Sequence, residues 1–433
     1  MRTDITHNGA NELTYEIREI TEVAKNIENY GKEIIWENIG DPIIKGESVP
    51  QWIKDIIIET VKDDDSYKYC PTKGLLETRE YIANENNKKN GAQITPEEVL
   101  FFNGLGEAIT KIYGLLKKES RVIGPSPAYP THSSTEALHS NCHPLMYIMD
   151  EKNCWNPDID DLYKKIKYNP TVSGILVINP GNPTGAVYSK KVLNEIVDLA
   201  NEYDLFILCD EIYHNLVYNS KKHTYLSKVI DDVCGISLKG ISKELPWPGA
   251  RCGWMETYNY DKDPYFKKYI DGIVKFKMVE VCSTTLPQKI IPKVMSNPKF
   301  KKYLEERNNY YEKASNYAYN KLSKINGVIV NKTNGAFYST VVFEEGVLNE
   351  NQKLNIDNKN LENYVNNVSQ NQPLDKRFVY NLMGNCGLCV VPMSSFNSEL
   401  NGFRATTLER DFNKLKYTYD ILSEKIEEYI NSN

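Results

Sequence analysis

The chain has 433 residues, which is enough for two domains with complete cores. Hydrophobic residues make up 41% and charged residues 25% of it, as in ordinary soluble globular proteins. The net charge of −6, with both signs interspersed, argues against a nucleic-acid partner. The first residues lack the apolar core of a signal peptide, and no apolar run approaches the roughly 18 residues of a membrane span, so no membrane partner is expected. Nine cysteines, an odd number, favour reduced thiols and a cytoplasmic location.

The N-terminal part begins with a predicted helix over residues 11–30. From about residue 50 to 295, short apolar runs alternate with helical stretches, and this rhythm predicts βαβ units and a mostly parallel sheet. The predicted strands cover 99–102, 121–123, 175–178, 205–209 and 235–238, and the predicted helices cover 107–118 and 190–203.

The C-terminal part has a different pattern of elements. The Asn- and Gln-rich stretch 344–376 predicts a surface loop and a helix. We expect residues 50–295 to form a large α/β domain, and residues 1–49 and 296–433 to form a smaller α+β domain together. The other predicted elements here are a helix at 301–322, a meander with strands at 328–330, 336–338, 389–391 and 402–404, and a closing helix at 411–431.

Cys386 and Cys389 form a C-x-x-C pair at the predicted entry to a strand. No second pair accompanies it, so a structural role is favoured over a metal or redox site, and no metal is expected.

Three short motifs follow three of the predicted strands. They are Asn-Pro-Gly-Asn-Pro-Thr-Gly at 179–185, Asp-Glu-Ile-Tyr at 210–213, and Ser-Lys at 242–243 with Arg251 eight residues later. Parallel sheets bind ligands at the carboxyl ends of their strands. Together the motifs supply a lysine for a Schiff base, a carboxylate for a ring nitrogen, hydroxyl and amide partners for a ring oxygen, and an arginine for a phosphate.

In order and spacing, these motifs resemble the class I/II aminotransferases of pyridoxal phosphate (PLP) fold type I, and the resemblance covers most of the chain. It implies PLP as cofactor, a large PLP-binding domain with a seven-stranded-type sheet between helices, and a homodimer with shared active sites. The chain departs from the family pattern at Pro246 and Trp247, where small or aliphatic residues are more usual. Gly240 stands where many relatives have a phosphate-binding serine.

The resemblance implies three catalytic residues, Lys243, Asp210 and Tyr213. Lys243 carries the cofactor and moves a proton between the substrate Cα and C4′ of PLP. Asp210 pairs with the protonated ring nitrogen, whereas an Asp that caps a turn is the alternative. Tyr213 and Asn182 donate hydrogen bonds to the ring oxygen O3′; a plain β-turn is the alternative for Asn182.

The remaining cofactor contacts concern the phosphate and the ring face. Residues 103–106 join a strand to a helix, so backbone N–H groups and the helix dipole converge there on an anion. Tyr129 matches the aromatic residue that stacks on the ring, with an ordinary core tyrosine as the alternative. Tyr69 matches a tyrosine that reaches the phosphate of the neighbouring subunit. The residues expected at the phosphate are Gly104, Leu105, Gly106, Ser242, Arg251 and Tyr69.

Substrate binding is expected from Arg404, Gly40 and Asn182. In the family an arginine of the last third of the chain clamps the α-carboxylate, and Gly40 adds a backbone amide; an exposed arginine in a surface ion pair is the alternative.

The segment around 387–396 looks most like the alanine aminotransferase branch, so alanine with 2-oxoglutarate is the leading substrate pair. An aspartate or broad-specificity aminotransferase and a PLP-dependent C–S β-lyase are the alternatives. A PLP-sensing regulator is disfavoured, because no basic helix-turn-helix precedes the large domain.

Overall fold

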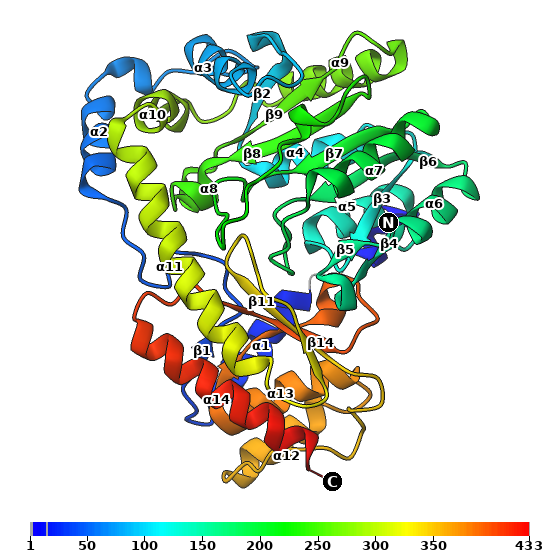
Figure 1. Ribbon diagram of the computed structural model, residues 1–433, viewed down its shortest axis with the longest axis vertical. Helices are drawn as coiled ribbons and strands as arrows, with labels where there is room; N and C mark the ends of the chain where they lie inside the picture. The colour runs from blue at the N-terminus through cyan, green and yellow to red at the C-terminus, as the bar shows by residue number, and fades with distance from the viewer. Residues whose placement is uncertain (1–2, 14–15, 433) are drawn as a thin grey trace.

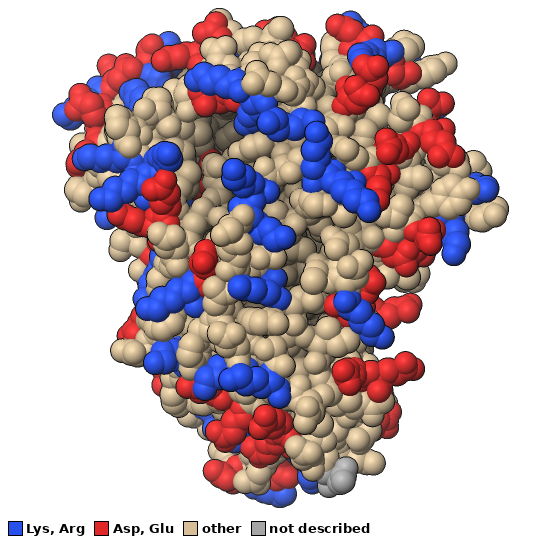
Figure 2. All heavy atoms as spheres, viewed as in Figure 1, with Lys and Arg blue, Asp and Glu red and all other residues tan. Residues whose placement is uncertain are grey.

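The computed structural model describes residues 3–13 and 16–432 of the chain. Figure 1 shows an upper body built around a large sheet and a lower body with smaller sheets, joined by the long helix α11 (Pro298–Leu322). Within the described residues, no helix is both long and apolar enough to cross a membrane. Figure 2 shows acidic and basic side chains spread over the same face of the molecule.

The large sheet has eight strands in the order β2-β9-β8-β7-β6-β3-β4-β5. It is mostly parallel; β9 runs antiparallel to both of its neighbours, and β5 runs antiparallel to β4. Five of its strands were predicted from the sequence, and β4 and β9 complete the seven-stranded type of sheet that the resemblance implied; the two-residue β5 extends it at one edge. The strands are β2 (Val99–Phe102), β3 (Arg121–Ser126), β4 (Met146–Asp150), β5 (Asn156–Pro157), β6 (Val172–Ile178), β7 (Phe206–Asp210), β8 (Gly235–Gly240) and β9 (Gly253–Tyr258).

Both faces of this sheet are buried, which explains why its strands read as continuous apolar runs. Successive residues of a strand point to opposite faces. In β7, Ile207 and Cys209 therefore belong to the core cluster that includes side chains of α6 and α7, whereas Phe206 and Leu208 belong to the cluster with side chains of α4 and α9. The helices of this body are α2 (Gln51–Val61), α3 (Leu76–Asn87), α4 (Leu105–Gly114), α5 (Pro130–Ser140), α6 (Ile159–Lys167), α7 (Lys190–Glu202), α8 (Ile241–Glu244), α9 (Pro264–Met278) and α10 (Thr285–Met295).

The lower body combines segments from both ends of the chain. A short β1 (Ile35–Trp36) pairs in parallel with β12 (Leu388–Cys389). The second sheet has the order β10-β11-β14-β13 and is antiparallel. Its strands are β10 (Val328–Val330), β11 (Tyr338–Phe343), β13 (Val391–Pro392) and β14 (Gly402–Thr406), and the helices of the lower body are α1 (Glu16–Glu28), α12 (Lys359–Val368), α13 (Leu374–Cys386) and α14 (Phe412–Ile430).

Several predicted boundaries were wrong, each for a local reason. The helix predicted at 107–118 is α4, which begins at Leu105 because Gly104, with φ of 87°, turns the chain into it. The helix α11 begins before residue 301 because the Asn297 side chain accepts from the N–H of Lys299 and Pro298 occupies its first turn. The strand predicted at 336–338 begins only at Tyr338, because Ala336 has φ of 55°.

Other predictions need smaller corrections. The helix predicted at 11–30 is a 3₁₀ turn (Asn8–Glu12) followed by α1, and residues 14–15 lie outside the described part of the chain. The strand predicted at 389–391 is interrupted at Val390. Cys386 ends α13 instead of entering a strand, and its thiol donates to the Leu382 carbonyl, while Cys389 is buried. The Asn-rich stretch is loop and helix as predicted, with α12 inside it.

Candidate active site

The predicted motifs meet at the carboxyl edge of the large sheet. β6, β7 and β8 are neighbours in it, and Asn179, Asp210 and the helix α8 stand at their carboxyl ends. A cavity of about 420 Å³ opens there. It is lined by Thr21, Asn38, Ile39, Gly40, Leu105, Gly106, Ile109, Tyr129, Ile178, Asn182, Asp210, Ile212, Tyr213, Ser242, Lys243, Pro248, Arg251, Tyr338 and Arg404.

Lys243 lies on α8, and its Nζ donates a hydrogen bond of 2.8 Å to the Gly40 carbonyl. The side chain opens onto the cavity but lies deep in the protein. Desolvation there lowers the pKa of Lys243 to about 8, with help from Arg404 and Arg251 and against the carboxylates of Asp41 and Asp210. At pH 7 roughly one amine in ten is therefore neutral, far more than for an ordinary lysine, and the neutral form is the nucleophile.

Asp210 ends β7 and is 4% exposed. One carboxylate oxygen accepts from the backbone N–H of Ile212 at 3.1 Å, and the other lies 3.1 Å from Nε2 of His132. His132 is itself fully buried on α5. This side chain thus holds the carboxylate in one orientation, facing the cavity.

Tyr213 and Asn182 flank that carboxylate on the cavity wall. The hydroxyl of Tyr213 lies 2.8 Å from the hydroxyl of Tyr338, and burial raises the pKa of Tyr213 well above its ordinary value. Oδ1 of Asn182 accepts from Nη1 of Arg404 at 3.2 Å, which fixes the orientation of the amide group.

The elements that the sequence predicts to bind an anion meet in the lining of the cavity. The helix α4 starts at Leu105, and Leu105 and Gly106 line the cavity, so the N-terminus of this helix borders it with the N–H groups of its first turn and its dipole. Gly104 lies behind Arg251: a Cβ on Gly104 would stand 2.4 Å from the Arg251 Nη2 atom. A Cβ on Gly106 would meet open space. Leu105, Gly106, Ser242 and Arg251 line the cavity as predicted, whereas Gly104 supports Arg251 from outside it.

Arg404 lies on β14 and is 3% exposed. Its Nη2 donates to the Asn38 carbonyl at 2.6 Å, and its guanidinium carbon lies 4.5 Å from the centre of the Tyr338 ring. The surface ion pair considered as the alternative is therefore wrong. The lower body thus presents one oriented cation to the same cavity that Lys243 enters from the upper body.

Tyr69, like Gly104, is a predicted site residue that lies outside the cavity lining. It is 81% exposed and does not line the cavity of its own chain. Its predicted role, to reach the phosphate of a neighbouring subunit, stays a prediction.

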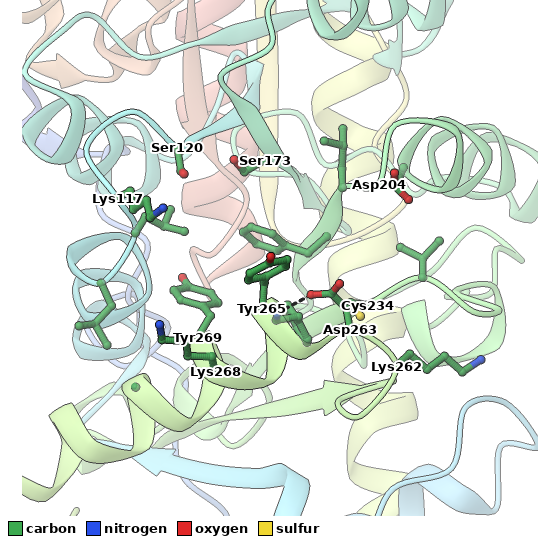
Figure 3. Close-up of a pocket in the computed structure, with 18 of the residues that line it drawn as sticks. Lys117, Ser120, Ser173, Asp204, Cys234, Lys262, Asp263, Tyr265, Lys268 and Tyr269 are labelled. Carbon is green, nitrogen blue, oxygen red and sulfur yellow. Dashed lines mark hydrogen bonds between the residues drawn. The ribbon is translucent and has the colours of Figure 1, made fainter.

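A larger cavity, of about 700 Å³, lies at the opposite edge of the sheet, where β6, β7 and β8 begin (Figure 3). Several of its polar side chains have structural partners. Asp263 caps α9 through the N–H of Phe266, Lys262 pairs with Asp232, and the Tyr269 hydroxyl donates to the Ile112 carbonyl. None of the predicted site residues lines it.

The side chains of the smaller cavity fit pyridoxal phosphate. The cavity combines a deep lysine amine, a buried carboxylate that suits a cationic ring nitrogen, phenol and amide groups, and a helix N-terminus beside an arginine. These are the groups that PLP sites use for the aldehyde, the ring nitrogen, the ring oxygen and the phosphate.

Fold and site together define a PLP enzyme of fold type I. The sequence model described as aminotransferase class I and II matches residues 34–413, and the chain belongs to this family. Members of the family use PLP, so the chain is a PLP-dependent aminotransferase, as the motifs predicted.

Individual relatives agree with this assignment. The chain is 63% identical over 430 residues to an uncharacterized aminotransferase of Methanocaldococcus jannaschii, covering 99% of this chain and 100% of that protein. It is 31% identical over 330 residues to the glutamate-pyruvate aminotransferase AlaA of Escherichia coli, covering 75% and 79%. The solved structure of alanine aminotransferase from Pyrococcus furiosus matches with a TM-score of 0.83 at 28% identity, covering 99% of each chain.

The sequence patterns did not indicate His132, Tyr338 or Asn38 as site residues. His132 follows Tyr129 by about one helical turn, which is the one sequence signal that links it to the site. Tyr338 and Asn38 come from the lower body and reach the cavity through tertiary packing alone.

Proposed function

We propose that this aminotransferase exchanges amino groups between alanine and 2-oxoglutarate, with Lys243, Asp210 and Tyr213 as its catalytic residues. The observation that supports this most is the single cavity of about 420 Å³ onto which Lys243, Asp210 and Arg404 all open. The choice of substrates is supported by the two relatives whose names state glutamate-pyruvate and alanine aminotransferase activity.

When bound, PLP supplies an aldehyde that accepts the substrate's amino group and a ring that withdraws electrons from the substrate Cα. Lys243 takes the proton from Cα and returns it at C4′, because its desolvated amine accepts a proton near neutral pH. Asp210 keeps the ring nitrogen protonated, since a buried carboxylate needs a cation opposite it. Tyr213 and Asn182 hold O3′.

The other lining residues position the cofactor and the substrate. The first turn of α4, Ser242 and Arg251 bind the phosphate, and Tyr129 stacks on the ring. We assign the α-carboxylate of the substrate to Arg404, whose planar fork is already oriented by Asn182 and by the Asn38 carbonyl. Gly40 adds its backbone amide to that carboxylate.

A panel of amino donors tests this substrate choice, with 2-oxoglutarate and pyruvate as acceptors and each product amino acid measured by chromatography. We expect alanine with 2-oxoglutarate, and glutamate with pyruvate, to give the highest kcat/KM. Aspartate as a tenfold better donor than alanine would contradict the pair. Release of pyruvate from cysteine conjugates without amino acid formation would indicate the C–S β-lyase instead.

The functional unit that we propose is a homodimer. Tyr67 and Tyr69 lie on an exposed stretch of the chain. This stretch runs beside residues 281–285, and the Thr72 hydroxyl joins the two segments by donating to the Val281 carbonyl. Met278, Val279 and Val281 also expose 55%, 77% and 52% of their surface there. Apolar side chains gathered on one surface are typical of a protein–protein contact.

The division into domains at residues 49/50 and 295/296 and the cytoplasmic location both remain proposals. The first is supported by the large sheet, which lies within 99–258, and by the smaller sheets, whose strands come from both ends of the chain.

A further inference from the structure

The helix that carries Lys243 is too short to hold itself in place. α8 has four residues, Ile241–Glu244, and no side chain caps its N-terminus. A single turn gains little from its own hydrogen bonds, and the last carbonyls of any helix lack partners within it. Something outside α8 must therefore fix the backbone of Lys243.

Arg307 makes that contact from the long helix α11. Its Nη2 donates to the Lys243 carbonyl at 2.9 Å and its Nη1 donates to the Glu244 carbonyl at 2.7 Å. Arg307 is 2% exposed and lies in the middle of a 25-residue helix. A cation at a helix C-terminus is also favourable to the helix dipole.

The guanidinium of Arg307 is held in turn by Glu47. Nε and Nη2 of Arg307 both donate to that carboxylate, and the Tyr311 hydroxyl donates to it at 2.6 Å. Arg410 adds a second cation at 2.7 Å. Burial alone would raise the pKa of Glu47, but Arg307 and Arg410 hold it below its ordinary value, so the carboxylate stays ionised.

This network joins three segments of the chain at the catalytic lysine. Glu47 belongs to the segment whose Gly40 carbonyl accepts from the Lys243 amine, Arg307 lies on α11, and Arg410 lies just before α14. Lys243 is therefore held at both ends: its backbone by Arg307 and its amine by Gly40.

We propose that Arg307 is a positioning residue that fixes the backbone of Lys243 from α11, so that the amine stays aligned with the cofactor and the substrate Cα. This inference rests on the proposed catalytic role of Lys243. In this proposal Arg307 touches neither the substrate nor the cofactor. Misplacement of a reacting group by about 1 Å can cost roughly 100-fold in rate.

The test compares two conservative variants of the holoenzyme, Arg307→Lys and Arg410→Lys. Both alter a cation on Glu47, but only the first removes the fork that holds the two carbonyls of α8. We expect Arg307→Lys to lower kcat roughly 10- to 100-fold with the KM for amino acid changed less than threefold, because Arg404 is untouched. Arg410→Lys should leave kcat within twofold.

Hydrogen–deuterium exchange of the same holoenzymes provides a readout besides activity. We expect faster exchange in Arg307→Lys at the amides of residues 241–245, and not in Arg410→Lys. Equal kcat values in the two variants, or unchanged exchange at 241–245 in Arg307→Lys, would overturn the proposal.

A double variant covers the case in which Arg307→Lys fails to fold. Glu47→Met with Arg307→Met removes both buried charges together, which folded proteins tolerate better than the loss of one partner. We expect it to fold and still to have low kcat and fast exchange at 241–245; wild-type kcat in this variant would overturn the proposal. A fully active Lys243→Ala would instead refute the proposed function, so the two failures can be told apart.

Discussion

At the scale of single residues, the surroundings of Lys243 suit a nucleophile better than a surface charge. Desolvation moves its pKa from the ordinary 10.5 to about 8, and the Gly40 carbonyl points its amine into the cavity. His132 orients Asp210 in the same way, and Asn182 orients Arg404. Lys243, Asp210 and Arg404 are thus each oriented by a neighbour, which is the arrangement that preorganised sites require.

The lowered pKa of Lys243 predicts how attachment of the cofactor depends on pH. Only the neutral amine attacks an aldehyde, so the rate of PLP attachment to the apoprotein should rise with pH and level off above about pH 8. Stopped-flow absorbance between pH 6 and 11 measures this rate, with a free lysine derivative, whose pKa is about 10.4, as the control. A rate that still rises tenfold between pH 9 and 10 would contradict the prediction.

Replacement of the two arginines of the cavity should impair different functions, substrate binding for Arg404 and cofactor binding for Arg251. Arg404→Ala should raise KM for every amino and oxo acid by roughly 100-fold while PLP stays bound, because a charge-assisted pair in a partly desolvated site is lost. Arg404→Lys should rescue little, since an ammonium cannot reproduce the fork. Arg251→Ala should lower cofactor affinity, and excess PLP should restore part of the rate.

Paired titrations of substrate and PLP on these variants measure both effects. If Arg404→Ala releases PLP with an unchanged KM, the assignment of the α-carboxylate to Arg404 is wrong.

At the scale of elements, the site is built from the segments that leave the carboxyl ends of the strands. Motifs at the ends of predicted strands indicated Asn182, Asp210 and Lys243, because a parallel sheet brings such ends to one edge. No comparable rule places Arg307, Tyr338 or His132. These side chains reach the site from helices and from the second sheet, and their positions depend on packing between segments as much as 260 residues apart, as for Arg307 and Glu47.

The entry to α4 gives a prediction at this scale. Gly104→Ala should weaken PLP binding roughly tenfold, because a side chain is strained at φ of 87° and its Cβ would collide with the Arg251 guanidinium. Gly249→Ala is the matched control, since a Cβ there meets open space two residues from Arg251. Cofactor dissociation constants of both holoenzymes provide the measurement, and equal values would refute the proposed role of Gly104.

At the scale of the whole molecule, the two bodies contribute different residues to the cavity. The upper body contributes Lys243, Asp210 and the helix α4, to which we assign the phosphate, and the lower body contributes Arg404 and Tyr338. The α11 helix connects them and also contacts the backbone of Lys243 through Arg307. Motion of one body relative to the other would therefore change both the binding of the substrate by Arg404 and the position of Lys243.

The proposed dimer predicts the behaviour of mixed dimers. With Tyr69→Phe in one chain and Lys243→Ala in the other, a tyrosine that acts on the neighbouring subunit places both defects in one site and leaves the other intact. Such dimers should keep about half of the wild-type activity at saturating substrate and PLP, as expected for one of two sites. If Tyr69 acts within its own chain, neither site is intact. Sedimentation of the active species as a monomer would also contradict the prediction.

The most decisive measurement on this enzyme is the identity of the lysine that carries the cofactor. Borohydride reduction of the purified holoenzyme, followed by proteolysis and mass spectrometry, fixes a pyridoxyl group to that lysine. We predict a single modified peptide that contains Lys243, and none in Lys243→Ala. Modification of another lysine in the wild-type protein, with Lys243 unmodified, would contradict the proposed role of Lys243 and the mechanism that depends on it.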